Sequence, residues 1–404
     1  MIMIPSLTIF STISSQYLGL TGAEQVLFFQ RLSVVVGVVM IIQTIWGHRY
    51  PLLDGPASAL LLSFIILAPH GISTIQGGMM VGACSLVLLS VFGLLRYLEP
   101  LFTDNVIGVI LILVALTLIP YLAPMVIGEG ESSPHGDPLV FGISVLVMVS
   151  IALFSNWLTG FPKTISLFLG IILGTVLMWA LGRMDVGGVR EASWFSLPRP
   201  IVPGIPRFSL SAIITFLVAY VAVLINAVGS IYSIGEVVGK EGLTGRLRRG
   251  IAVMGIGGIG GGSLGVVGTV SFAFSPGVVL VTRVGSRFAV TVCGGLIFSL
   301  AFFSKFLAVL TSFPASVVGA ATLTAMAAQI GAGISIITRS GRSLDGRDYM
   351  VIGIPVLMGG VVSILPHTFF AVFPATAHAL LKNGLVVGIV LVLLLEHLLL
   401  PRRL

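Results

Sequence analysis

Residues 250–287 read GIAVMGIGGIGGGSLGVVGTVSFAFSPGVVLVTRVGSR, and this is the most informative part of the chain for predicting its architecture. Eight glycines crowd residues 255–268. Glycine weakens a helix but lets neighbouring backbones approach closely. Val270–Phe274 is rich in branched and aromatic residues, which is typical of extended backbone. Because a helix can begin at Pro276, we expect an apolar segment that is broken in its middle.

A second interrupted stretch lies in the first half of the chain. Tyr50–Leu60 reads YPLLDGPASAL, in which extended residues lead to Gly55-Pro56 and an apolar helix follows from Ala57. Each half of the chain therefore has one broken segment, third in its half. Broken segments at matching positions indicate a transporter site built from inverted repeats. The N–H groups that begin each half-helix would favour carbonyl oxygens or anions.

The composition requires a membrane protein. Of the 404 residues, 56% are hydrophobic and 9% are charged, and the mean hydropathy is +1.14, whereas a soluble domain is about 25% charged. The sequence predicts an all-α polytopic membrane protein. Its fourteen apolar segments fall at residues 2–16, 27–47, 51–70, 74–95, 106–126, 138–157, 161–182, 209–238, 251–270, 272–287, 288–312, 314–338, 347–366 and 380–400.

Lys and Arg in the connections predict the orientation of these segments. One set of connections holds fourteen basic residues and the opposite set holds five, with Arg31 and Lys305 left inside spans. We expect the richer set to face the cytoplasm, which places the C-terminus there and the chain in the cell membrane. Segment 2–16 is barely long enough to form a complete first span.

Other features argue against other classes of protein. The net charge of +7 is explained by cytoplasmic basic residues near anionic lipid, so no nucleic-acid partner is expected. Cys84 and Cys293 lie in separate apolar runs and no histidine pair has ligand spacing, so we expect no metal. We expect no cofactor, since the G-x-G-x-x-G pattern of residues 255–260 lacks its strand and acidic residue. No nucleophile–base pair suggests an enzyme.

The second broken segment resembles the signature of the uracil/xanthine permease family, also known as nucleobase–cation symporter-2 or nucleobase–ascorbate transporters. That signature is an acidic or amide residue followed by Asn-x-Gly-x-x-x-x-Thr-Arg. Gly277, Thr282 and Arg283 fit it, whereas Ser275 stands in place of Asn and Phe274 in place of the acidic or amide residue.

Three further stretches resemble the same family. Gly47–Ala59 is similar to the entry to its broken third span, and Lys305–Ile336 to its eleventh and twelfth spans. Asn226–Gly229 is similar to its eighth-span motif Glu-x-x-Gly, with Asn226 in the acidic position. The resemblance covers the chain from about residue 37 to the C-terminus.

The resemblance implies a specific architecture and activity. About fourteen transmembrane segments would form two inverted repeats of seven, with short β-type stretches in the broken third and tenth segments. Residues 1–95 and 209–312 would form a core domain, and residues 96–208 and 313–404 a gate domain. It also implies import of a nucleobase-like solute such as uracil or xanthine, coupled to H⁺ or Na⁺, by a homodimer.

Candidate site residues follow from the two broken segments and the eighth span. The family's carboxylates on the eighth and tenth spans are absent here, because Asn226 cannot titrate and Phe274 can only stack or pack. We expect the solute to meet hydroxyl, amide, aromatic and backbone N–H groups instead. These groups belong to Ala57, Ser58, Asn226, Ser230, Phe274, Ser275 and Gly277, and Asp54 is a candidate for the coupling ion.

Two alternatives remain open on the sequence. An anion transporter of the sulfate-carrier type shares this architecture, and two positive helix ends without carboxylates would suit an anion. A non-transporting membrane component, such as a degenerate permease, would retain the fold without uptake. The sequence names neither the solute nor the coupling ion.

Overall fold

The chain forms a bundle of helices, most of them coincident with the predicted apolar segments. The computed structural model describes residues 3–129, 133–184, 189–190, 192–199, 205–239, 241–272, 275–282, 284–338, 343–370, 381 and 383–401. The predicted site residue Phe274 and the signature residue Arg283 lie outside these described residues.

The first half of the chain contributes helices that run from the N-terminus to Ala180. They are α1 (Met3–Leu18), α2 (Ala23–Ile45), α3 (Ser58–Leu67), η1 (Ala68–His70), α4 (Ile72–Val91), α5 (Leu95–Leu98), η2 (Glu99–Leu101), α6 (Asp104–Ile127), α7 (Pro138–Trp157), α8 (Phe161–Thr164) and α9 (Ser166–Ala180). The start of α7 has a clear local cause, because the Asp137 carboxylate accepts the N–H of Leu139 (2.8 Å) and Pro138 occupies the first helical position.

The second half contributes a similar series. It contains α11 (Leu210–Val238), α12 (Leu243–Leu264), α13 (Ser275–Thr282), α14 (Arg287–Leu300), α15 (Ser304–Thr311), α16 (Ala315–Ile337), α17 (Gly346–Ile364), α18 (His367–Phe370), α20 (Gly384–Leu394) and the π-helical turn η3 (Leu395–Leu399). Asp345 begins α17 through a capping box, in which Asp345 and Asp348 satisfy each other's backbone N–H groups.

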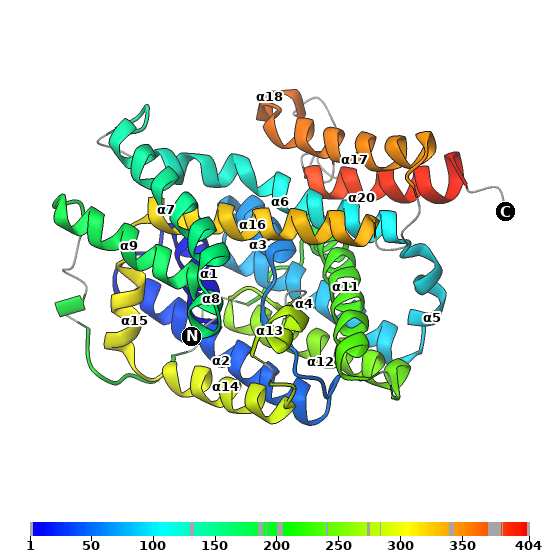
Figure 1. Ribbon diagram of the computed structural model, residues 1–404, viewed down its shortest axis with the longest axis horizontal. Helices are drawn as coiled ribbons and strands as arrows, with labels where there is room; N and C mark the ends of the chain where they lie inside the picture. The colour runs from blue at the N-terminus through cyan, green and yellow to red at the C-terminus, as the bar shows by residue number, and fades with distance from the viewer. Residues whose placement is uncertain are drawn as a thin grey trace.

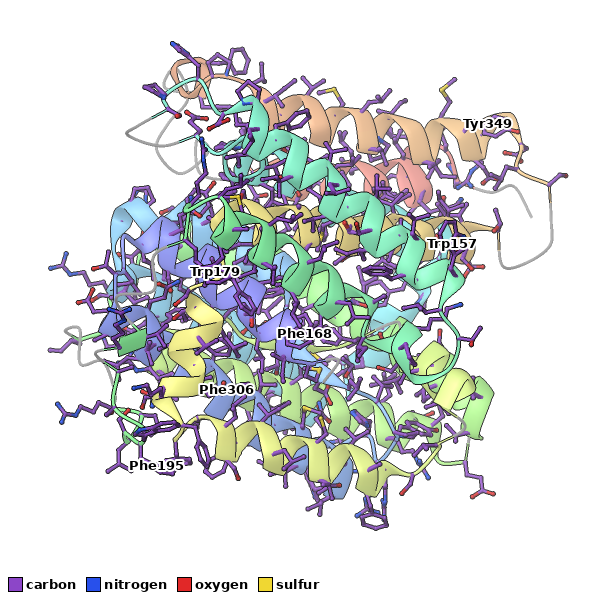
Figure 2. All side chains as sticks on the ribbon, turned by 60° about the vertical axis from the view of Figure 1, so that its left-hand side comes forward. Trp157, Phe168, Trp179, Phe195, Phe306 and Tyr349 are labelled. Atoms are coloured by element: carbon purple, nitrogen blue, oxygen red, sulfur yellow. The ribbon has the colours of Figure 1, made fainter. Side chains whose placement is uncertain are left out.

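The chain is a multi-pass membrane protein. Within the described residues, seven helices are long and apolar enough to cross a membrane, and the bent pair α14–α15 would make an eighth. Figure 2 shows aromatic side chains projecting from the outer surface, among them Trp157, Trp179 and Tyr349, which are 76%, 63% and 61% exposed. Large apolar side chains cover more of the surface than is usual for a protein in water, and such a surface is suited to contact with lipid.

One predicted segment is not a straight span. The sequence suggests an unbroken helix over residues 288–312, whereas α14 and α15 meet at 92°. The break releases the carbonyl of Ala301, which accepts a hydrogen bond from the buried Gln30 amide of α2 (2.8 Å). A side chain from a neighbouring helix thus satisfies the backbone group that the bend exposes.

The helices gather into two groups on either side of the interrupted segments (Figure 1). Helices α2, α12 and α14 lie along the lower side of that view, and α6, α7, α17 and α20 along the upper side. The most extensive packing occurs between α6 and α16, between α4 and α12, and between α2 and α14. Helices α3 and α13 lie near the middle, so both broken segments are surrounded by protein.

Candidate functional site

The two interrupted stretches meet as a short antiparallel sheet in the middle of the bundle. Strand β1 (Asp54–Pro56) pairs with β2 (Thr269–Ser271), with Asp54 opposite Ser271. Two flanking bonds extend the ladder: Ala57 N–H donates to the carbonyl of Gly268 (2.9 Å), and Phe272 N–H to that of Leu53 (2.8 Å). Because the backbone groups that face the partner strand are paired there, non-helical chain is more stable inside an apolar interior.

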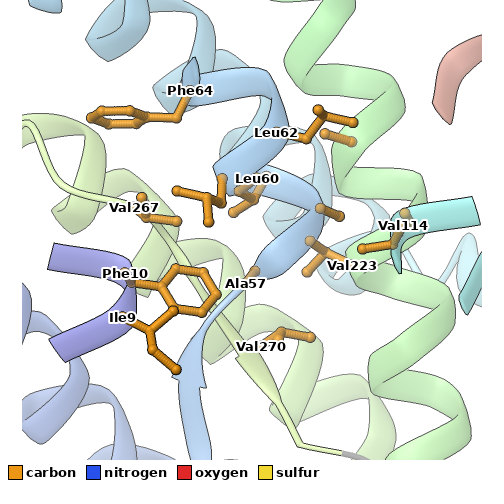
Figure 3. Packing of buried hydrophobic residues seen from close by; sticks show 14 of the residues in the cluster. Ile9, Phe10, Ala57, Leu60, Leu62, Phe64, Val114, Val223, Val267 and Val270 are labelled. Carbon is orange, nitrogen blue, oxygen red and sulfur yellow. The ribbon is translucent and has the colours of Figure 1, made fainter. Parts of the chain in front are cut away.

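A small cavity lies beside this crossing. Its volume is about 10 Å³, which is close to the minimum that one water molecule needs. Figure 3 shows Ala57 at the start of α3, with Val270 of β2, Val223 of α11 and Val114 of α6 near it. The described lining residues are Ala57, Ser58, Ala59, Ile110, Leu111, Val114, Ala222, Val223, Asn226, Val270 and Gln329, and none of them is charged.

Three polar side chains converge on this cavity. The Ser58 hydroxyl donates to Oε1 of Gln329 on α16 (3.4 Å), and the Gln329 amide nitrogen donates to the carbonyl of Leu111 on α6 (3.2 Å). The Asn226 oxygen accepts only a long bond from Ser230 (3.4 Å), and within the described part of the chain its amide nitrogen has no acceptor. Among the described residues, Asn226 therefore has hydrogen-bonding capacity left over at the cavity.

The start of α3 adds backbone donors. Ala57, the residue before the helix, has no side chain that can cap it, so the first N–H groups of α3 lack intrahelical partners. Ala57 lines the cavity, but its own N–H is donated to Gly268. The available donors therefore belong to Ser58 and Ala59, one and two positions beyond the predicted Ala57.

The other predicted site residues take supporting positions. Ser230 is buried, and its hydroxyl lies 2.7 Å from the Asn226 carbonyl and 3.0 Å from that of Ser271. The Ser275 hydroxyl accepts the Leu53 N–H (3.1 Å) and so fastens α13 to the chain before β1. Gly277 lies in the first turn of α13, and Ser275 is not among the described residues that line the cavity.

Asp54 forms a buried polar cluster with Ser271 and His48, near the cavity. Its Oδ1 accepts from the Ser271 hydroxyl (2.6 Å), and its Oδ2 lies 3.2 Å from Nε2 of His48. The backbone N–H of Tyr50 donates to Nδ1 of His48 (3.0 Å), so a neutral His48 carries its proton on Nε2 and donates it to Asp54. Asp54 and His48 are both 0% exposed.

Sequence reasoning missed Gln329, His48 and Ser271. Gln329 is a polar residue in an otherwise apolar run of α16, which was an available signal. His48 comes close to Asp54 only because the chain turns back at Arg49, whose φ of 57° is unusual for a residue other than glycine. Ser271 faces Asp54 only through the strand register, which a single sequence does not reveal.

The chain was also compared with known protein families and curated proteins. A family model described as "Permease family" matches residues 1–368. The uric acid transporter UacT of Escherichia coli is 27% identical over 360 residues, which is 87% of this chain and 74% of that protein. The xanthine permease of Bacillus subtilis is 23% identical over 379 residues, or 92% of this chain and 85% of that protein.

Solved structures share the architecture at much lower identity. The transmembrane domain of the cyanobacterial bicarbonate transporter BicA aligns with a TM-score of 0.63 at 12% identity, covering 90% of this chain and 95% of that one. The murine anion transporter Slc26a9 in its inward-facing state aligns with a TM-score of 0.64 at 11% identity, covering 96% of this chain and 65% of that one. At this identity the likeness concerns the fold alone.

Proposed function

The chain belongs to the Permease family, and from that premise we propose that it is a secondary-active transporter of a nucleobase-like solute of the oxopurine or uracil class. It is a permease and not an enzyme. The observation that carries the solute class is the pair of carboxamides, Asn226 and Gln329, at one cavity with Ser58. A carboxamide matches the adjacent N–H and C=O groups of a lactam ring edge through two hydrogen bonds.

The uncharged lining favours an oxopurine. The relatives UacT and xanthine permease are named for uric acid and xanthine. An acidic oxopurine that has lost a proton would be repelled by a carboxylate, and none of the described lining residues carries one. The N–H groups at the start of α3 would instead attract its oxygens. We therefore place a purine with several ring carbonyls ahead of a neutral pyrimidine as the solute.

We also propose that the chain consists of two inverted repeats of seven segments. The repeats would be α1, α2, α3, α4, α6, α7, α9 and α11, α12, α13, α14–α15, α16, α17, α20. Packing supports this assignment, because contacts recur between equivalent segments: α2–α14 corresponds to α4–α12, α7–α9 to α17–α20, and α6–α17 to α7–α16. The antiparallel pair β1–β2 would lie on the pseudo-twofold axis.

Transport would proceed by movement of the core domain against the gate domain. The dominant helix contacts lie within the proposed core or within the proposed gate, and those across the boundary, such as α3–α6 and α11–α6, are much less extensive. The Ser58–Gln329 bond joins α3 of the core to α16 of the gate. Since the cavity is far smaller than a nucleobase, the two domains must separate before a solute can enter.

Asp54 is our candidate for the coupling-ion site, with H⁺ as the ion. Asp54 is fully buried within the membrane-spanning bundle, and carboxylates in such positions commonly mark ion or proton pathways. A short chain of hydrogen bonds joins this carboxylate to Asn226. The Ser271 hydroxyl donates to Asp54, and the Ser230 hydroxyl lies within hydrogen-bonding distance of the Ser271 and Asn226 carbonyls. A shift in these hydrogen bonds would couple protonation to solute binding.

The orientation and assembly complete the proposal. We place the protein in the cell membrane with its C-terminus in the cytoplasm, on the strength of the fourteen-to-five distribution of basic residues. We propose a homodimer because the family resemblance implies one.

Uptake by proteoliposomes tests the function. We expect labelled uric acid or xanthine to accumulate, with unlabelled oxopurines competing and sulfate or bicarbonate leaving uptake unchanged. Asn226→Ala should raise the KM by about 10-fold or more. Ser299→Ala on α14, whose hydroxyl bonds only its own helix among the described residues, should match the wild type. Competition by sulfate or bicarbonate alone would instead establish the anion carrier, and no uptake of any solute would indicate a degenerate permease.

A further inference from the structure

A second and larger cavity lies away from the proposed solute site. Its volume is about 310 Å³, roughly twenty times the ~10–15 Å³ that one water needs. It is bounded by the chain before β1, the end of α11, the beginning of α12 and the chain before α14. We call it the basic cavity, and its described lining residues are Arg49, Tyr50, Pro51, Val238, Gly239, Glu241, Arg246, Gly285 and Arg287.

The basic cavity carries an excess of positive charge. Three arginines and one glutamate line it, which leaves a formal charge of 3 − 1 = +2. Within the described residues, none of these guanidinium groups forms an ion pair with a carboxylate, Glu241 included. Three guanidinium groups around one hollow, without carboxylate partners among the described residues, indicate that an anion completes the site.

Arg246 and the backbone of Arg49 are held in place by the surrounding chain. Arg246 lies over the ring of Tyr50 (4.4 Å to its centre) and donates to the carbonyl of Arg49 (3.2 Å). Among the described residues, Arg49 is the one non-glycine residue with positive φ, at 57°. Such backbone is disfavoured and persists where the surroundings impose it, often at a ligand site. Fixed guanidinium groups lose little entropy when they bind.

From this geometry we propose that the basic cavity binds a phosphate-bearing anion. Several arginines present planar donor forks that match phosphate oxygens, and the volume accommodates more than one phosphate group or a lipid headgroup. The three guanidinium groups are only partly buried, so a ligand can enter from the aqueous or headgroup region. The inference does not depend on which solute the protein carries.

A ligand bound in the basic cavity would affect the β1–β2 pair, where the two broken segments cross. Tyr50 stacks on His48 (6.5 Å between ring centres, 19° between planes), and His48 bonds Asp54 of β1. The Tyr50 hydroxyl also donates to the carbonyl of Gly239, directly after α11 (3.0 Å). An anion bridging Arg49, Arg246 and Arg287 would join the chain before β1 to α12 and α14, while Tyr50 joins the same chain to the end of α11. Its binding would therefore regulate movement of the segments that carry Asp54 and Asn226.

Arg287→Gln is the most informative variant. Apart from backbone bonds, the contact of Arg287 within the described residues is with the Phe288 ring (5.0 Å), so its loss should not unfold the protein. Arg190→Gln is the matched control, because Arg190 is exposed and outside the cavity. The first measurement is pyrophosphate binding to detergent-purified protein by calorimetry. We expect Arg287→Gln to weaken it by about 10-fold or more and Arg190→Gln to leave it unchanged.

The second measurement identifies the source of the phosphate. Native mass spectrometry would count lipids retained from nanodiscs of phosphatidylcholine with and without phosphatidylglycerol. Retention of phosphatidylglycerol that pyrophosphate displaces and Arg287→Gln abolishes assigns the cavity to a lipid headgroup. Pyrophosphate binding without lipid retention assigns it to a soluble phosphate compound. The proposal is overturned if neither binds, or if Arg287→Gln and Arg190→Gln weaken binding equally.

Discussion

The two interrupted segments use the same backbone design but carry different chemistry. The first, at residues 50–67, brings the Asp54 carboxylate, the Ser58 hydroxyl and the free N–H groups of α3 to the cavity region. The second, at residues 269–282, brings hydroxyls whose partners are parts of the first segment: Ser271 donates to Asp54, and Ser275 accepts from Leu53. We infer that the first segment meets solute and ion while the second holds it in place.

This division has a structural cause. In the observed strand register, Asp54 lies directly opposite Ser271. Two carboxylates at those positions would repel each other in a buried site, whereas a carboxylate and a hydroxyl form a hydrogen bond. The paired backbone therefore favours unlike side chains, and the second segment provides the donor.

The largest expected effect comes from removing the charge of the first segment. Asp54→Asn keeps the shape of the side chain and can still accept one hydrogen bond through its amide oxygen. The amide carries no charge and cannot bind and release a proton as a carboxylate can. We expect accumulation driven by a pH gradient to fall by about 10-fold or more, while exchange of solute across liposomes without a gradient continues. The measurement is uptake with and without the gradient.

Asp104→Asn provides the control for this experiment. Asp104 is a carboxylate in the first turn of α6, outside the buried cluster, and its replacement should leave the accumulation ratio unchanged. If Asp54→Asn accumulates solute as the wild type does, the ion is held elsewhere, and the first segment has no special role in coupling.

Much of the fold was predictable from the sequence because long apolar runs have few alternatives in a membrane. The predicted segment 138–157 coincides with α7, and segment 314–338 differs from α16 (Ala315–Ile337) by one residue at each end. The bend between α14 and α15 was not predictable in the same way. The carbonyl of Ala301 at the bend is satisfied by Gln30, which is distant in sequence and donates a tertiary hydrogen bond.

Residues of the candidate site were predictable only where a single stretch of sequence was enough to identify them. Ser58 is a polar residue at a break, and Asn226 lies in an apolar helix at the acidic position of the eighth-span motif that the sequence resembles; both residues line the cavity. His48 required a turn with positive φ at Arg49, and the distinction between Ala57 and Ala59 as backbone donors required the ladder bond to Gly268. Such features arise when distant parts of the chain pack together.

Two serine variants distinguish the roles of the two segments. Ser275→Ala leaves the buried N–H of Leu53 without an acceptor, so we expect the free energy of unfolding to fall by about 1–3 kcal/mol with little change in KM. Ser58→Ala removes a 3.4 Å bond to Gln329 beside the cavity, so we expect the KM to rise about two- to fivefold with little change in stability. Thermal unfolding and uptake kinetics measure the two effects.

The pair of variants serves as its own control, since each replaces a serine hydroxyl with hydrogen at the start of a half-helix. A rise in KM for Ser275→Ala that matches the rise for Ser58→Ala would show that both segments meet the solute equally. A loss of stability confined to Ser58→Ala would reverse the assignment.

The smallest expected effect concerns a carboxylate at the surface, which gives a reference for the buried Asp54. The hydrogen bond from Arg183, followed by that from the Leu139 N–H, holds the pKa of Asp137 below its usual range. A carboxyl whose folded pKa is lowered adds stability above its unfolded pKa of about 3.9, and that stability is lost as the pH falls through the folded pKa.

Asp137→Asn should therefore lower the unfolding temperature slightly near neutral pH and by progressively less as the pH falls below about 4. Asparagine remains a good residue for beginning α7, so the difference reports the charge. High salt should shrink it, because the pair is exposed to solvent. A difference that persists unchanged at the lowest pH would show that the charge of Asp137 contributes nothing. Uptake should be unaffected, because this carboxylate, unlike Asp54, lies outside the crossing of the two broken segments.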